Sequence, residues 1–330
     1  MSSTNSTGPI MPSNIIEASH SELVLFLVLN MWPSHFGLPL LLAIVIFSSR
    51  VQRHATFINL LVVFMIVGIS SSLLVYAGKT TGPEPSKPLC LFQASLLYGM
   101  PAITSLAAFS LVLQMFMVIR SAFYGKTYLE REHNVRRWMM IAIPYVAWMA
   151  FMLVTAAVGA ASPQYISRSR RFFYCSVKND TLTNILGIVA AVVILATLVL
   201  EVWTVVLFYK RWFGSHKHSH NMLSSLELNL PIRILAFGLY LAIAMSLSIL
   251  SISAPSSPIP DLIIASAATV VILIFGTQPD ILRVLCFQKA KESQPDKNVI
   301  NVDLPVEEEK GHSLFLEPIM ITHLKARPGM

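Results

Sequence analysis

Long apolar stretches run through most of this chain and restrict the folds open to it. There are seven of them, each about 20 to 30 residues long, and polar loops separate them. A helix needs roughly 20 apolar residues to cross the hydrocarbon core of a bilayer, and backbone groups in lipid must be hydrogen-bonded internally. The stretches therefore predict seven transmembrane helices. They cover residues 22–48, 55–77, 90–119, 138–159, 183–209, 232–253 and 261–285.

The overall composition supports a membrane protein. Of the 330 residues, 55% are hydrophobic and only 12% are charged, whereas a soluble domain carries about 25% charged residues. The alternative is a soluble helical protein with deeply buried helices. It is disfavoured because the deficit of charge extends over the whole length. The predicted fold is an all-α membrane protein, a seven-transmembrane helix bundle.

Basic residues fall mostly on one side of the predicted spans. Of the 24 Lys and Arg residues, 18 lie in the first, third and fifth loops and the C-terminal tail, and six lie in the other loops. Basic loops face the cytoplasm, so the N-terminus is expected outside and the C-terminus inside. The net charge of +7 does not indicate nucleic-acid binding, because it sits in short loops beside the spans.

The chain divides into three predicted regions. Residues 1–21 form a disordered extracellular N-terminus, residues 22–285 the seven-helix domain, and residues 286–330 a cytoplasmic tail. The first span is too long for a signal peptide and is interpreted as an anchor. We expect an integral protein of the plasma membrane.

Prolines mark the expected irregularities of the spans. Pro33 and Pro39 are expected to kink or interrupt the first span, and Pro101 and Pro144 to bend the third and fourth. Pro279 is expected to start a short amphipathic helix after span 7, along the inner surface, which would end the span near residue 277.

Three cysteines and two sequons suggest covalent modifications. Cys90 opens the third span at its outer end and Cys175 lies in the fourth loop, so both face the oxidising side and are predicted to form a disulfide, with two free thiols as the alternative. Cys286 lies alone beside the inner end of span 7 and is a candidate for palmitoylation. Asn5 and Asn179 begin glycosylation sequons on the outer side.

Few polar side chains fall inside the spans. Glu201 lies roughly two turns from the inner end of span 5, and Arg233 lies near the inner end of span 6. An ionisable residue at such a depth is a functional candidate by default. The two residues are predicted to form a latch between the helices. The alternative is a carboxylate that is protonated or reaches the headgroups.

Motifs of catalysis and transport are missing from the sequence. No zinc-protease, nucleophile-elbow or intramembrane-protease motif occurs, and no span carries a chain of carboxylates. The histidines of residues 216–220 are interpreted as part of a solvated basic loop rather than a metal site. We therefore expect no catalytic residues, no enzyme activity, no cofactor and no metal.

The arrangement of spans and cysteines resembles a G-protein-coupled receptor. The resemblance covers residues 22–289 and rests on the seven spans, the outer N-terminus, and a cysteine at the head of span 3 facing one in the next outer loop. The switch motifs of rhodopsin-like receptors are absent. Residues 117–121 read Met-Val-Ile-Arg-Ser, and residues 275–280 read Phe-Gly-Thr-Gln-Pro-Asp.

Shorter motifs point to particular branches of that superfamily. Residues 89–93, Leu-Cys-Leu-Phe-Gln, followed by residues 174–176, Tyr-Cys-Ser, resemble the cyclic-AMP-receptor-like and secretin-like branches. Residues 275–285 are similar to orphan seven-helix receptors of basidiomycete fungi. The chain is therefore expected to be similar to a fungal orphan receptor.

The resemblance implies a cell-surface receptor that senses an extracellular ligand and signals to a heterotrimeric G protein inside. A ligand would enter from outside between spans 3, 5, 6 and 7. The residues expected to reach it are Gln93, Tyr98, Tyr240 and Asp261. The residues expected to face the G protein are Arg120, Arg136, Arg137, Lys210, Arg211 and Arg233.

Two other functions stay open at this stage. A seven-helix transporter or channel for a small solute would need polar residues along a continuous path, and the spans supply few. A membrane enzyme or scaffold has no motif in its favour. For a receptor, Arg168 and its basic neighbours in the fourth loop point either to an anionic ligand or to contact with lipid headgroups.

Overall fold

Helices make up most of the described structure. The computed structural model describes residues 19–48, 51, 53–124, 130–168, 173–215, 232–244, 246 and 258–286, all within the unit Met1–Gln288. Asn5 and the tail beyond Cys286 lie outside these residues, so the predictions made for them stay predictions.

Five helices of the described part are long and apolar enough to cross a membrane, as expected of a helical membrane protein. Two further apolar helices are shorter. The five long spans are His20–Phe47, Lys87–Ser121, Asn134–Ala161, Asp180–Leu207 and Ile259–Gly276, and the shorter helices are Ala55–Ser71 and Ile232–Ala244. Each of the seven overlaps one predicted span.

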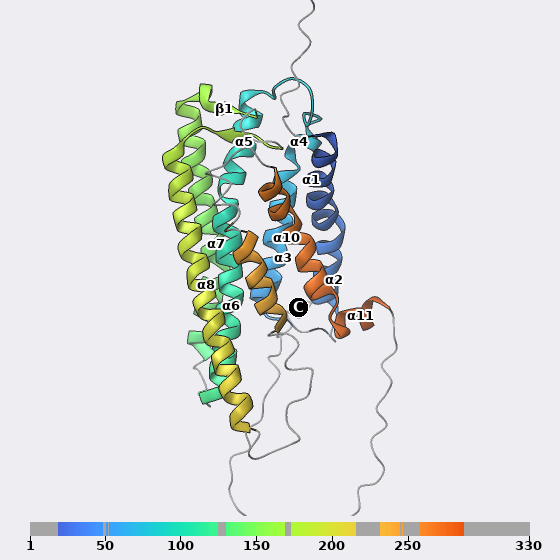
Figure 1. Cartoon of the computed structure of the whole chain (residues 1–330), viewed down its shortest axis with the longest axis vertical. Helices are drawn as coiled ribbons and strands as arrows, with labels where there is room; N and C mark the ends of the chain where they lie inside the picture. The colour runs from blue at the N-terminus through green and yellow to red at the C-terminus, as the bar shows by residue number, and fades with distance from the viewer. Residues whose placement is uncertain are drawn as a thin grey trace, which may run out of the picture. The chain divides into compact units, whose positions relative to one another are not determined.

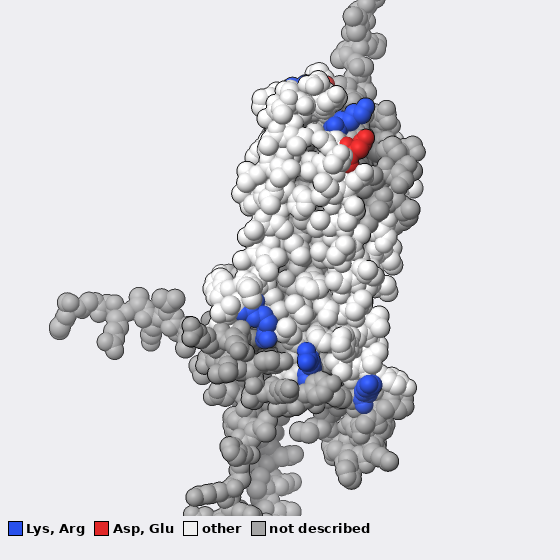
Figure 2. Space-filling model, turned by 90° about the vertical axis from the view of Figure 1, so that its left-hand side faces the viewer, with Lys and Arg blue, Asp and Glu red and all other residues white. Residues whose placement is uncertain are grey.

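The outward faces of these helices are apolar. On α8 (Asp180–Ser215), Ile188, Val192, Leu195 and Val199 are between 55% and 64% exposed. They recur every three or four residues and so share one helix face. An apolar face of this kind is unfavourable in contact with water and favourable in contact with lipid. On the face drawn in Figure 2, charged side chains lie toward the two ends and the middle is uncharged.

The first span is interrupted near its middle. It comprises α1 (His20–Trp32), a π-helical turn η1 (Pro33–Gly37) and α2 (Leu38–Phe47). The predicted interruption at Pro33 is confirmed, and it takes the form of one wide turn. Ser19 and Glu22 form a capping box at the start of α1, so residues 19–21 are ordered, contrary to the prediction.

The second and third spans are each divided in two. The second comprises α3 (Ala55–Ser71) and the short α4 (Leu73–Tyr76), and the third comprises α5 (Lys87–Tyr98) and α6 (Met100–Tyr124). The break in the third span falls at Gly99, close to the predicted bend at Pro101. A Cβ at Gly99 would lie 2.3 Å from Trp148 Cδ1, so the absent side chain lets α5 approach the neighbouring helix α7.

The remaining elements complete the unit. α7 (Glu130–Ala161) contains Pro144 and leads through η2 (Pro163–Tyr165) to an antiparallel hairpin of β1 (Ile166–Ser167) and β2 (Ser176–Val177). After α8 come the Ile232–Ala244 helix, α10 (Ile259–Gly276) and α11 (Pro279–Leu285). The seventh span thus ends at Gly276, and Pro279 begins the predicted short helix, which turns away from the direction of α10 at the lower end of the bundle (Figure 1).

Aromatic side chains join three helices in the main core. Phe237 of the Ile232–Ala244 helix lies with its ring centroid 6.0 Å from Phe64 of α3 and 5.7 Å from Phe275 of α10. Phe275 in turn lies 4.8 Å from Phe57 of α3. These edge-on contacts hold α3, α10 and the Ile232–Ala244 helix against one another.

Gly68 on α3 allows the closest approach to the interrupted first span. A Cβ at this position would lie 2.5 Å from Ser34 Cβ and 2.8 Å from the Asn30 carbonyl oxygen, and a backbone atom cannot rotate away. We expect Gly68→Ala to destabilise the protein by about 1–3 kcal/mol through overpacking. The measurement is thermal unfolding of the protein purified in detergent.

Gly276→Ala is the matched control for that experiment. A Cβ at Gly276 would find its nearest neighbour, Ile272 Cγ2, at 3.7 Å, an ordinary contact. Its melting temperature should stay close to that of the wild type. Equal melting temperatures for all three proteins would contradict the close packing of α3 on the first span.

Candidate functional site

A disulfide fixes the hairpin segment onto the helices at one end of the unit, which we call the disulfide end. Cys175 is bonded to Cys90 in the first turn of α5, and the two Cα atoms are 5.2 Å apart. The predicted pairing is therefore present. We call residues 173–177 the roof. Besides the covalent bond, the ring of Phe173 stacks on Phe26 of α1 at a centroid distance of 4.5 Å.

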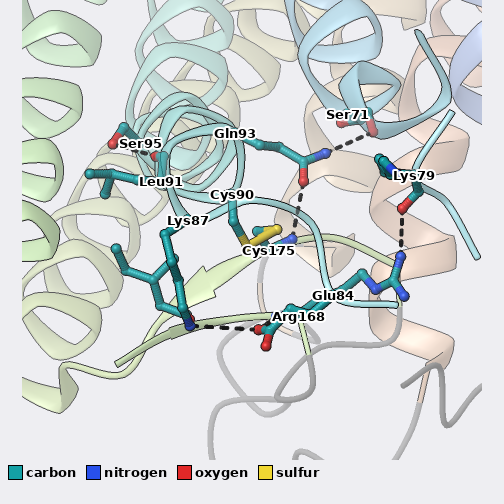
Figure 3. The surroundings of a disulfide bond; sticks show 11 residues. Ser71, Lys79, Glu84, Lys87, Cys90, Leu91, Gln93, Ser95, Arg168 and Cys175 are labelled. Carbon is teal, nitrogen blue, oxygen red and sulfur yellow. Dashed lines mark hydrogen bonds and ion pairs between the residues drawn. A yellow bond between two sulfur atoms is a disulfide. The ribbon is translucent and has the colours of Figure 1, made fainter. Parts of the chain in front are cut away.

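Two side chains of α5 hold the roof by its backbone. Gln93 is fully buried, and its Oε1 accepts the Cys175 N–H at 3.1 Å while its Nε2 donates to the Ser71 carbonyl at 3.4 Å (Figure 3). The Tyr98 hydroxyl donates to the Val177 carbonyl at 2.6 Å. The roof is thereby tied to α3 and α5 through the N–H of Cys175 and the carbonyl of Val177.

Arg168 joins the hairpin to the loop of residues 77–86, between α4 and α5, at the same end. Its side chain is 1% exposed, and its guanidinium donates to the carbonyls of Lys79 at 2.5 Å and Gly82 at 2.8 Å. Burial lowers the pKa of this guanidinium, and the nearby Glu84 carboxylate opposes the shift. Arg168 therefore has a structural role. The contact with an anionic ligand that the sequence suggested is not supported at this residue.

Beneath the roof lies a cavity of about 190 Å³ lined by residues of α1, α3, α5, α6, α8, α10 and the Ile232–Ala244 helix. Its polar lining gathers at the disulfide end. Thr183 and Asp261 stand in the first turns of α8 and α10, and Tyr174 and Ser176 belong to the roof. The deeper lining is mostly apolar and includes Phe64, Met100 and Leu241.

Two of the four residues predicted to reach a ligand line this cavity. They are Tyr98 and Asp261. The side-chain amide of Gln93 hydrogen-bonds to the roof and to α3, and Gln93 does not line the cavity. Tyr240 instead hydrogen-bonds to the Ile263 carbonyl and Ser266 Oγ, each at 2.7 Å, and so joins its helix to α10. Depth in the membrane alone did not distinguish a cavity contact from a helix–helix contact.

Other lining residues were missed by the sequence reasoning. The Tyr174 hydroxyl donates to Asp261 Oδ1 at 3.0 Å, and Ser176 is 2% exposed. Both flank Cys175, so the predicted disulfide carried a usable signal: the bond to Cys90 brings its sequence neighbours over the bundle. Asn30 on α1 lines the cavity as well and had no comparable signal.

Polar contacts at the end opposite the disulfide involve α10 and α11. Arg53 pairs with Asp280 of α11 and also donates to the Gln278 side chain. Arg233 donates to the Ile274 carbonyl and, at 2.7 Å, to Thr277 Oγ1. Basic groups suit the carbonyl-rich C-terminus of a helix, which is where α10 ends.

The predicted latch between Glu201 and Arg233 is wrong. Glu201 is 6% exposed, and its Oε1 has no hydrogen-bond partner among the described residues. The carboxyl group lies over Gly238, where an added Cβ would be only 1.5 Å from Oε1. Gly238 is about 7.5 Å along the helix from Arg233. The space left by this glycine takes the carboxyl group, and Arg233 reaches α10 instead.

Charge is distributed unequally between the two ends. Among described side chains, the disulfide end carries four basic and four acidic residues, and the opposite end seven basic and one acidic. Five of the six residues predicted to face a G protein belong to the opposite end, and the side chain of the sixth, Arg211, is not described. The basic residues there are Arg53, Arg120, Arg136, Arg137, Lys210, Arg233 and Arg283.

Neither the residues predicted to be modified nor the described metal-ligating side chains form a further candidate site. Cys286 is exposed, and Asn179 caps α8 by accepting the Leu182 N–H at 2.9 Å. Palmitoylation and glycosylation of these residues stay predictions. The described part of the chain contains no group of three or more His, Cys, Asp or Glu side chains placed to hold a metal ion.

No protein-family model matches the chain, and no curated protein sequence matches it.

Arg168 offers a direct test of how the hairpin is held. Arg168→Met keeps the apolar stem but leaves the carbonyls of Lys79 and Gly82 without their donor. Because a buried hydrogen bond to a charged group contributes about 1.5–3 kcal/mol, amide hydrogen exchange in the hairpin should rise at least tenfold. Mass spectrometry of peptides covering residues 162–179 measures it, and non-reducing mapping checks that the Cys90–Cys175 bond still forms.

Lys79→Ala is the control for Arg168→Met, because the Lys79 side chain is exposed and only its carbonyl accepts from Arg168. Exchange in the control should match that of the wild type. If Arg168→Met also left the exchange unchanged, Arg168 would not hold the hairpin.

Proposed function

We propose that this chain is a seven-helix cell-surface receptor of the plasma membrane. Five long apolar helices and two shorter ones correspond to the seven predicted spans. The excess of basic residues at the end opposite the disulfide is the pattern of a cytoplasmic face, and it supports an outer N-terminus. The disulfide end is then extracellular, which is the oxidising side that a disulfide needs.

The observation that carries this proposal is the cavity under the disulfide-tied roof. Ligand sites are typically concave and mostly apolar, with a few polar groups, and often lie between the helices of a bundle. This cavity has that composition and lies next to the end proposed to be outside. An extracellular molecule would meet it without crossing the bundle. A receptor uses such a site, whereas a scaffold has no need of one.

The contacts of α10 supply a physical connection between the two ends. Its first turn carries Asp261, bonded to Tyr174 of the roof, and its last turn accepts hydrogen bonds from Arg233. A ligand that displaces Tyr174 would act on the same helix that restrains the inner end of the Ile232–Ala244 helix. A ligand shifts such an equilibrium only by binding one state better.

The signalling partner in this proposal is a heterotrimeric G protein at the basic end, as the resemblance to fungal orphan receptors implies. The seven basic side chains also suit anionic lipid, at about 1 kcal/mol each. The two roles are compatible, so binding to the membrane alone does not test the partner. Nucleotide exchange on the G protein does.

Arg233 is the residue whose removal should alter signalling. Arg233→Met loses the bonds to the end of α10, and a loss of about 1 kcal/mol shifts a two-state population roughly fivefold. We expect basal guanine-nucleotide exchange to rise by about that factor. The measurement uses the full chain in lipid nanodiscs with a panel of purified heterotrimeric G proteins.

Arg283→Met is the matched control, since Arg283 is exposed on α11 at the same end. It removes the same charge and should leave basal exchange unchanged. If no G protein in the panel responds to the wild type or to Arg233→Met, the receptor proposal fails. Solute flux into proteoliposomes would then test the transporter alternative.

A further inference from the structure

The volume of the cavity indicates the size of molecule that suits it. An apolar cavity of about 150 Å³ is large enough to bind benzene. At about 190 Å³, this cavity fits a molecule only slightly larger than a single aromatic ring with a short substituent. Its deeper wall, with Phe64, Met100, Leu241 and Ala268, offers apolar contact and suits the body of such a molecule.

Most hydroxyl groups of the lining already donate a hydrogen bond within the protein. The Tyr98 hydroxyl donates to the Val177 carbonyl at 2.6 Å, Thr183 Oγ1 to the Asn179 carbonyl at 2.9 Å, and Thr104 Oγ1 to the Met100 carbonyl at 2.8 Å. The Tyr174 hydroxyl donates to Asp261. A hydroxyl that has donated its proton retains lone pairs, so these groups face a ligand as acceptors.

Asp261 is the strongest acceptor among the described residues of the lining. Its Oδ1 accepts the Tyr174 hydroxyl at 3.0 Å. A carboxylate offers about four lone-pair sites, so Asp261 can accept a further hydrogen bond from a ligand beside Tyr174.

The charge of the lining separates ligand classes further. Among the described residues that line the cavity, Asp261 supplies the one carboxylate, and none is Lys, Arg or His. A carboxylate ligand would be desolvated here without a cationic partner, which is strongly unfavourable. An amine or an alcohol meets acceptors instead.

We infer that the cavity binds a compact, largely apolar molecule whose polar end is a hydrogen-bond donor, an amine or an alcohol, and that it excludes carboxylates. The polar end lies under the roof beside Asp261, and the apolar body lies against Phe64 and Leu241. This inference rests on the proposed function in so far as the cavity is taken as the receptor's ligand site. Its test needs no G protein.

The experiment compares four probes of similar size that differ at the polar end: 2-phenylethylamine, 2-phenylethanol, phenylacetate and ethylbenzene. The full chain purified in detergent is titrated with each, and the rise in melting temperature gives the affinity. The amine and the alcohol should stabilise the protein more than ethylbenzene, and phenylacetate should have no effect. Binding of phenylacetate as tight as that of the amine overturns the inference.

Two variants locate the polar end. Asp261→Asn should weaken the amine by about tenfold or more, the loss of one hydrogen bond to a charged group, and leave ethylbenzene unchanged. Asp180→Asn is the matched control, because Asp180 is exposed in the first turn of α8 and does not line the cavity. Equal affinities for the amine in the wild type and Asp261→Asn would overturn the placement of the polar end.

The outcomes separate this inference from the proposed function. Probes that bind as expected to a protein that activates no G protein would leave the ligand class standing and refute the receptor. Exchange stimulated by a carboxylate ligand, with that stimulation lost in Tyr98→Phe, would refute the ligand class and leave the receptor standing.

Discussion

The bond between Cys90 and Cys175 is the constraint on which the disulfide end depends. It joins residues 85 apart in the sequence, and it holds a strand of only two residues that could not stay in place by its own ladder. The other side-chain contacts that hold the roof are individually weak: one stacked ring at Phe173, and single hydrogen bonds to Gln93, to Tyr98 and from Tyr174 to Asp261. Each is worth about 1 kcal/mol and is insufficient alone. Once the covalent bond places the backbone, these weak contacts act together, and they put Tyr174 and Ser176 over the cavity.

The middle of the bundle obeys a different constraint, because lipid offers no partner to a polar group. Hydroxyls there donate to the carbonyl four residues earlier in their own helix, as Thr155, Thr197 and Thr204 do. Few polar side chains are then left to link helices at this depth, and association depends on close packing at Gly68 and Gly99 and on the aromatic contacts around Phe237. Glu201 departs from this rule, and Gly238 is the residue that makes room for it.

The sequence predicted what hydropathy and proline chemistry decide, and little of what packing decides. The spans lie close to their predicted positions because apolar length determines them, and the interruption at Pro33 follows from its missing N–H. The break at Ser72 has no comparable signal, whereas the break at Gly99 falls two residues before the bend predicted at Pro101. The partners of Glu201 and Arg233 depend on the rotation of each helix about its axis, which neighbouring side chains set and a single sequence does not reveal. Gln93 shows the same limit: a lone polar residue near the outer end fits a ligand contact, and only its neighbours show that it holds the roof.

The breaks in the helices lie on the same side of the molecule as the cavity, and this has a mechanical consequence. η1 and Gly99 divide the first and third spans next to residues that line the cavity, such as Asn30 and Tyr98, and Ser72 follows the end of the lining helix α3. Such turns absorb changes of backbone angle more readily than a continuous helix does. α10 is continuous from Ile259 to Gly276, and it is anchored by Tyr174 at one end and Arg233 at the other. In the proposed receptor, a molecule in the cavity would displace the divided helices locally, whereas displacement of α10 would carry to the opposite end. We therefore expect α10 to transmit binding, because it is continuous and has polar contacts at both ends.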